Sequence, residues 1–181
     1  PKDKVSARDN VVRWLGPKDG TAGPGAGDWV RVNGFGTPWW ADDLEALSQT
    51  AVGGVMLAMV ESVDHVTETA KRLPDVPIVA LVETARGLER ISEIASAKGT
   101  FRLAFGIGDF RRDTGAGADP MALAYARSKL VVASRVGQLP GPIDGPTLTD
   151  SENELLEACK VTQNMGMTGK LTLRIDQTDP I

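Results

Sequence analysis

Two carboxylates in the chain stand where short apolar runs end. Glu83 directly follows the run IVALV, and Asp109 closes the segment RLAFGIGD. An apolar run that stops at an acid is typical of a buried parallel strand that brings the acid to the carboxyl edge of a sheet. Oxygen ligands suit Mg²⁺, which keeps several waters and shares its other positions with substrate oxygens. The two acids therefore predict a divalent-cation site.

Composition indicates one soluble globular domain. A chain of 181 residues with 41% hydrophobic content and a formal net charge of -4 can bury a sizeable core. It has no apolar run of membrane length and no signal-peptide pattern, and its scattered lysines and arginines argue against a nucleic-acid partner. The single cysteine, Cys159, excludes an intrachain disulfide framework and makes a cytoplasmic location the default. We expect a single domain over residues 1–181, and the first residue, Pro1, predicts a processed or cut N-terminus.

Apolar runs alternate with helical patterns at a spacing of roughly 25 to 35 residues, close to the repeat of a barrel of strands and helices. Helical patterns begin at Asp42 or Asp43, after Glu83, at Asp119 and near Leu155. Strict alternation of strand and helix predicts a parallel sheet covered by helices. The six predicted strands span residues 29–33, 52–58, 77–83, 101–106, 141–145 and 169–174.

Two α/β architectures fit this alternation. An open doubly wound sheet accommodates six parallel strands with nothing missing. A TIM (β/α)8 barrel requires two further strands, yet it explains why polar residues end several different strands, since the catalytic face of a barrel collects residues in that way. These strand-end residues are Arg31, Asn33, Glu61, Glu83, Asp109 and Asp144.

Seven segments carry a further signal through their order and spacing, namely VRVN, VMLAMVES, ALVETARGLERISEIA, LAFGIGDF, AYARSKLVVASR, PIDGP and GKLTL. Together they resemble the citrate lyase β subunit and its relatives in the HpcH/HpaI aldolase superfamily, which includes malyl-CoA and citramalyl-CoA lyases. Members of that family are TIM barrels that open with two further strands. The resemblance therefore implies a partial TIM barrel, with strands 3 to 8 represented and the first two strands missing from this chain.

The resemblance also implies roles for individual residues. Glu83 and Asp109 match the positions that hold a divalent cation, usually Mg²⁺, and Glu83 also lies close to the substrate. Arg31 matches the arginine that binds substrate oxygens, so Arg31 and Glu83 are the expected catalytic pair. Gly106 and Gly108 let the backbone approach the ligand closely, and the amide of Gly108 is an expected substrate contact.

The implied function is that of a Mg²⁺-dependent carbon-carbon lyase. It would cleave or form a 3-hydroxyacyl-CoA thioester of the citryl, malyl or citramalyl type, giving an acyl-CoA and a 2-oxo acid through a metal-stabilised enolate. The resemblance also suggests a homotrimer or hexamer. Two alternatives stay open: a class II aldolase on free hydroxy-oxo acids without CoA, and a barrel that has lost catalysis and serves in binding or assembly.

Departures from the family pattern motivate these alternatives. The fourth strand of the family often ends in PKVES, whereas this chain has Ala58 and Met59 before VES, and Arg174 stands where IHPxQ has histidine. No catalytic base is assigned, because no histidine lies near the predicted site.

Structural roles would also explain several of these residues. Glu83 could be an acid favoured by the start of a helix, and Arg31 could pair with a structural carboxylate such as Glu61. Asp144, between isoleucine and glycine in PIDGP, is expected to be a turn residue. His65, the only histidine, is expected at the surface at a helix start.

Overall fold

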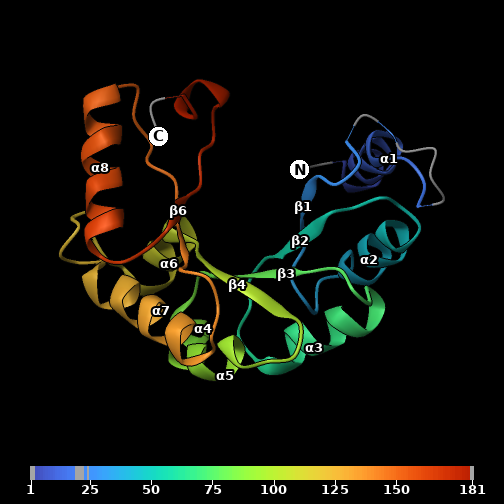
Figure 1. The fold of residues 1–181 in the computed structure, drawn as a ribbon, viewed down its shortest axis with the longest axis horizontal. Coiled ribbons are helices and arrows are strands. Elements are labelled where there is room, and N and C mark those ends of the chain that lie inside the picture. The colour runs from blue at the N-terminus through green and yellow to red at the C-terminus, as the bar shows by residue number, and fades with distance from the viewer. Residues whose placement is uncertain (1–2, 19–22, 24, 180–181) are drawn as a thin grey trace.

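A computed structural model describes residues 3–18, 23 and 25–179, which form one parallel sheet with helices packed against it (Figure 1). The six predicted strands are confirmed, with the last two shorter than expected. Each strand pairs in parallel with the next one along the chain, so the sheet order is β1-β2-β3-β4-β5-β6. The strands are β1 (Trp29–Val32), β2 (Gly54–Leu57), β3 (Ile78–Val82), β4 (Thr100–Phe105), β5 (Ile143–Asp144) and β6 (Gly169–Lys170).

Helices connect successive strands, and α2, α3, α5 and α7 lie along one side of the curled sheet (Figure 1). The helix predicted after Glu83 is divided into α4 and α5 at Arg90. Within the described ranges, no helix is long and apolar enough to cross a membrane. The helices are α1 (Lys4–Leu15), α2 (Trp40–Ser48), α3 (Val63–Arg72), α4 (Ala85–Glu89), α5 (Ile91–Ala95), α6 (Ile107–Thr114), α7 (Ala124–Val136) and α8 (Glu152–Asn164), followed by a 3-10 turn, Ile175–Gln177.

The core lies mainly between the sheet and its helices. All five residues of β3 are buried, because side chains alternate between two covered faces. Ile78, Ala80 and Val82 join the large helix-facing core, whereas Val79 and Leu81 belong to a smaller cluster on the inner, concave face. The residue after β3 therefore points its side chain toward the inner face.

The expectation of a TIM (β/α)8 barrel with strands 3 to 8 represented is wrong, because the six strands form a curled open sheet, although the α/β class is confirmed. The sheet ends on β1 and β6, which do not pair with each other in the described part of the chain. Closing a parallel barrel takes about eight strands at a tilt of about 36°, and six strands cover only part of the circle. The doubly wound alternative also fails, since such a sheet reverses its strand order at a switch point. The result is a curled, open half-barrel, in which the rings of Trp29 in β1 and Phe101 in β4 lie in a tilted arrangement, 5.6 Å apart between their centroids.

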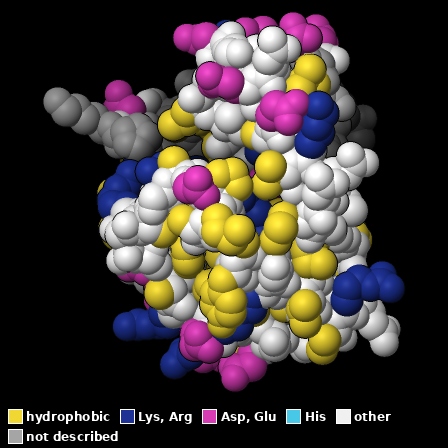
Figure 2. Space-filling view, turned by 90° about the vertical axis from the view of Figure 1, so that its left-hand side faces the viewer, with side chains coloured by type: hydrophobic (Ala, Val, Ile, Leu, Met, Phe, Trp, Pro, Cys, Tyr) yellow, Lys and Arg dark blue, Asp and Glu magenta, His cyan; other side chains and the backbone are white. Residues whose placement is uncertain are grey.

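Figure 2 shows the side of the molecule that carries α7 and α8, where apolar side chains gather in the middle of the surface. The exposed apolar residues of α7 and the turn before it are Met121, Tyr125, Val132 and Val136. The outer face of α7 is thus not covered by the described part of this chain.

Candidate active site

Glu83 is the centre of the candidate site. It follows β3 directly, and only 2% of the residue is exposed. Its Oε1 atom accepts a hydrogen bond of 2.8 Å from the backbone N–H of Met59, at the end of β2. Its Oε2 atom lies 3.9 Å from a guanidinium nitrogen of Arg31. The buried carboxylate is therefore contacted from β1 and from the turn after β2.

Burial raises the pKa of the Glu83 carboxyl above the ordinary value for glutamate. The Met59 amide and the positive charge of Arg31 lower this pKa in part, while the neighbouring carboxyl of Asp109 raises it further. The structure thus brings the two predicted acids close enough for the Asp109 carboxyl to raise the pKa of Glu83.

Asp109 lies in the first turn of α6, just beyond the end of β4. Only Gly106 separates the end of β4 from the start of α6. An acid in a first turn is favoured by the helix dipole. The Asp109 side chain is 37% exposed and forms an ion pair with Arg112. It is therefore the more accessible acid of the pair.

Arg31 pairs with Glu83 and not with Glu61. Its side chain is 60% exposed on β1, and it reaches Glu83 past the intervening strand β2. Glu61 has its own partners, since it accepts a hydrogen bond of 2.9 Å from the Thr84 hydroxyl and lies 3.5 Å from Arg86. The predicted structural pair between Arg31 and Glu61 is therefore not formed, and Arg31 pairs with Glu83 instead.

The donor set fits a hard divalent cation. Two carboxylates share one edge of the sheet, and the described residues bring together no group of three or more histidine, cysteine, aspartate or glutamate side chains. Two protein oxygens suit Mg²⁺, which keeps waters and binds substrate oxygens in its other positions. A Cβ atom added at Gly106 would lie 2.5 Å from Oε2 of Glu83, so the absence of a side chain there lets the Glu83 carboxyl group pack closely against the backbone between β4 and α6. By contrast, a Cβ atom at Gly108 meets nothing within 4 Å.

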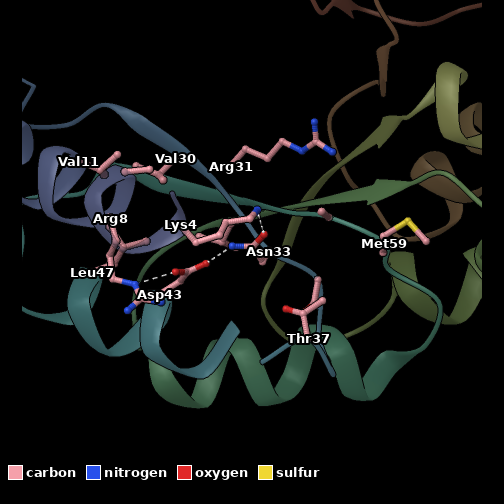
Figure 3. Close-up of a pocket in the computed structure, with 14 residues that line it drawn as sticks. Lys4, Arg8, Val11, Val30, Arg31, Asn33, Thr37, Asp43, Leu47 and Met59 are labelled. Carbon is pink, nitrogen blue, oxygen red and sulfur yellow. Dashed lines mark hydrogen bonds and ion pairs between the residues drawn. The ribbon is translucent and has the colours of Figure 1, made fainter. Parts of the chain in front are cut away.

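A cavity of about 530 Å³ lies between α1, β1 and α2. Arg31 and Met59 line it, and both contact Glu83, so the cavity adjoins the acid pair. Figure 3 shows a chain of polar contacts on its other side: Lys4 donates to Asn33, which donates to Asp43. Arg8 donates to the second oxygen of Asp43 at 2.9 Å.

Sequence reasoning missed α1 and this polar chain. The signal was available, because Lys4 and Arg8 are four residues apart and therefore share one face of a helix. The role of Met59 was missed for another reason. It acts through its backbone, which side-chain chemistry does not predict.

Asp144 is not the turn residue expected from its glycine and proline neighbours. It is completely buried, and Arg127 of α7 donates to it at 3.1 Å. Thr162 of α8 donates to it at 2.7 Å, and the ammonium group of Lys170 lies 3.5 Å away. These partners place Asp144 in the helix-facing layer, away from Glu83. His65 is half-buried and stacks on Phe35 at 4.8 Å.

The fold and site define an α/β protein with a carboxylate pair and an arginine at the carboxyl edge of a parallel sheet. Residues 1–174 match the model of the HpcH/HpaI aldolase/citrate lyase family. The chain therefore belongs to this family.

Relatives and solved structures agree with this membership. A citrate lyase subunit beta-like protein of Mycobacterium tuberculosis is 40% identical over 119 residues, covering 61% of this chain and 42% of that protein. A (3S)-malyl-CoA thioesterase of Cereibacter sphaeroides is 28% identical over 153 residues, covering 83% of this chain and 53% of that protein. The chain thus spans about half the length of the curated relatives it matches.

Crystal structures similar to the fold include those of RipC and CitE. RipC from Yersinia pestis matches with a TM-score of 0.87 and 25% identity, over 99% of this chain and 80% of that one. CitE from Mycobacterium tuberculosis, in complex with magnesium, acetoacetate and coenzyme A, matches with a TM-score of 0.74 and 30% identity. The latter match covers 84% of this chain and 58% of that one.

Proposed function

We propose that this chain carries the metal and substrate site of a Mg²⁺-dependent carbon-carbon lyase. The substrate would be a 3-hydroxyacyl-CoA thioester of the citryl, malyl or citramalyl type. The observation that carries the proposal is the surroundings of Glu83: a buried acid at the end of β3, with Arg31 3.9 Å away and Asp109 beside it. The ligands named for the CitE structure, magnesium, acetoacetate and coenzyme A, support the same chemistry.

Glu83 and Asp109 would hold the cation, which when bound supplies Lewis-acid polarisation of the substrate oxygens. In the cleavage direction the substrate hydroxyl loses its proton, and its carbon becomes the carbonyl of the 2-oxo acid. The electrons of the broken C–C bond pass to the acyl thioester as an enolate, which then takes up a proton to give the acyl-CoA. Arg31 would bind the carboxylate of the 2-oxo acid with charge-assisted hydrogen bonds and fix its orientation.

Hydrolysis of the thioester is the second candidate. The match to a (3S)-malyl-CoA thioesterase over 83% of this chain favours it. The two reactions are separated by their products from malyl-CoA: a lyase gives glyoxylate and keeps the thioester, whereas a thioesterase gives malate and a free thiol. A thiol reagent and a glyoxylate assay on the same sample distinguish them. Competition by free CoA would further separate either reaction from an aldolase that acts without CoA.

Calorimetry with Mg²⁺ and oxaloacetate tests the site itself. We expect the two ligands to bind together, and Glu83→Gln or Asp109→Asn to weaken Mg²⁺ binding by tenfold or more, as about 1.4 kcal/mol corresponds to each factor of ten. Arg31→Ala should weaken oxaloacetate binding while Mg²⁺ still binds. Glu61→Gln is the matched control, because Glu61 also follows a strand but has Thr84 and Arg86 as partners. Unchanged Mg²⁺ binding in both acid variants would contradict the proposal.

A further inference from the structure

Met59 has an unusual backbone conformation. Its φ angle is +54°, in the left-handed region, where among the described residues the other non-glycine cases are Asp75 and Gln138. Aspartate and glycine enter this region readily, but a long aliphatic side chain does so uncommonly. Such a conformation persists only where the surroundings hold it, and it often marks a functional position.

The surroundings of Met59 hold it from two sides. A Cβ atom at Gly34 would lie 2.9 Å from the carbonyl oxygen of Ala58 and 3.1 Å from Cβ of Met59, so the absent side chain lets the loop pack against the end of β1. On the other side, Nδ1 of His65 lies 3.3 Å from the Met59 carbonyl oxygen and 3.3 Å from the Glu61 amide. The turn after β2 is therefore fixed between β1 and α3.

This turn aims the Met59 amide at Glu83. The amide donates to Oε1 at 2.8 Å, whereas Oε2 faces Arg31 at 3.9 Å and packs next to Gly106, where an added Cβ atom would lie 2.5 Å from it. The two carboxylate oxygens thus have different surroundings, and the amide fixes how the carboxyl group is rotated. Met59 is 42% exposed and lines the cavity, and only its backbone takes part in this hydrogen bond.

We propose that Met59 is a positioning residue, whose left-handed backbone turns its amide onto Oε1 of Glu83 and leaves Oε2 free to bind the divalent cation. The part of this inference that concerns the cation rests on the proposed function. The hydrogen bond and its dependence on the backbone of Met59 do not.

The backbone requirement is tested with Met59→Val and Met59→Gly. A β-branched residue strongly disfavours positive φ, so valine should turn the amide away, whereas glycine keeps both the conformation and the N–H. Hydrogen bonds to charged groups are among the stronger ones, so we expect Met59→Val to weaken Mg²⁺ binding about tenfold or more. Met59→Gly should stay within about twofold of the wild type, since its donor is retained. Gln138→Val is the matched control, because its φ is +57° and it lies at the end of α7.

A second measurement needs no metal. In the ¹H–¹⁵N spectrum of the protein in EDTA, the Met59 amide should resonate downfield, as a donor to a carboxylate does, and should shift upfield in Glu83→Gln. Glu89→Gln is the control, because Glu89 pairs with Lys129 and is exposed. The amide resonance should not respond to that change.

The outcomes separate the two proposals. A Met59 amide that ignores Glu83→Gln overturns the positioning role. So does a Met59→Val variant that binds Mg²⁺ as the wild type does, or a loss that Gln138→Val reproduces. If the Met59 amide responds to Glu83→Gln but the wild type binds no Mg²⁺, the proposed function fails, and so does the part of the inference that concerns the cation. The positioning of the Glu83 carboxyl by the Met59 amide is then still supported.

Discussion

Replacing Gly106 by alanine should damage the site through one methyl group. Gly106 separates β4 from α6, and its amide donates to the carbonyl oxygen of Val82 at 2.9 Å. An added Cβ atom would lie 2.4 Å from Cβ of Glu83, 2.5 Å from its Oε2 and 3.1 Å from its Cδ. The nearest of these atoms is attached to the backbone of the buried residue after β3, so it cannot swing away.

The expected cost follows from these contacts. Overpacking a rigid site of this kind typically costs about 1–3 kcal/mol. If the Glu83 carboxyl rotates to relieve the contact, it leaves the Met59 amide, and a hydrogen bond to a charged group is worth about 1.5–3 kcal/mol. We therefore expect Gly106→Ala to lower the free energy of unfolding by about 1–3 kcal/mol, and to weaken Mg²⁺ binding because Oε2 is displaced.

Urea unfolding and Mg²⁺ calorimetry measure the two effects. Gly117→Ala is the control, because Gly117 is exposed, has an ordinary φ, and its added Cβ atom would meet nothing closer than 4.0 Å. That variant should match the wild type in both assays. If Gly106→Ala unfolds at the wild-type urea concentration and binds Mg²⁺ normally, the close packing of Gly106 against Glu83 is refuted.

Two further predictions concern buried charge. The wild type should become less stable as the pH rises, and Glu83→Gln should remove this dependence. The folded state raises the pKa of Glu83, so it binds more protons than the unfolded chain between about pH 4.3 and the raised value. The free energy of unfolding of the wild type therefore falls as the pH rises through that window. Urea midpoints measured in EDTA from about pH 5 to pH 8 check this, and parallel curves for the two proteins would count against it. Asp144→Asn should lower the free energy of unfolding by about 3–5 kcal/mol, because two buried cations lose their counter-charge. Asp176→Asn, in an exposed ion pair, should leave the urea midpoint unchanged, and equal effects of the two changes would refute the argument.

The strands were predictable because buried strands consist mainly of apolar residues. The run PIVALVE gives β3, whose residues are buried on both faces, and a strand of that kind requires a continuous apolar run. Helix ends were less predictable. The helix expected from Asp119 begins at Ala124, because the Asp119 side chain accepts a hydrogen bond from the amide of Met121 within a preceding turn. Sheet closure was not predictable from such runs, since local patterns do not show how far a sheet curls.

The sequence predicted which residues form the site better than it predicted their arrangement. The strand ends placed Glu83 near Asp109 and Arg31, because parallel strands end at one edge of a sheet. The environment of Asp144 could not be predicted, since its arginine partner lies 17 residues before it and its lysine partner 26 residues after it. The glycine and proline next to Asp144 indicate only its local backbone, whereas its environment is determined by the charged partners Arg127 and Lys170, which are distant in the sequence.

Arg31 and Glu83 lie on strands that are not neighbours, since β2 separates β1 from β3. A ligand that binds both side chains would connect β1 to the end of β3 across β2 and would hold the curvature of the sheet at this edge. The strength of ligand binding would then depend on the curvature of the sheet. A larger residue at Gly54, whose added Cβ atom would lie 2.5 Å from the ring of Trp29, would therefore weaken binding from the opposite end of the strands. The bound ligand would also restrict bending of the sheet, so the amide hydrogens of β2 would exchange more slowly with solvent when the ligand is bound.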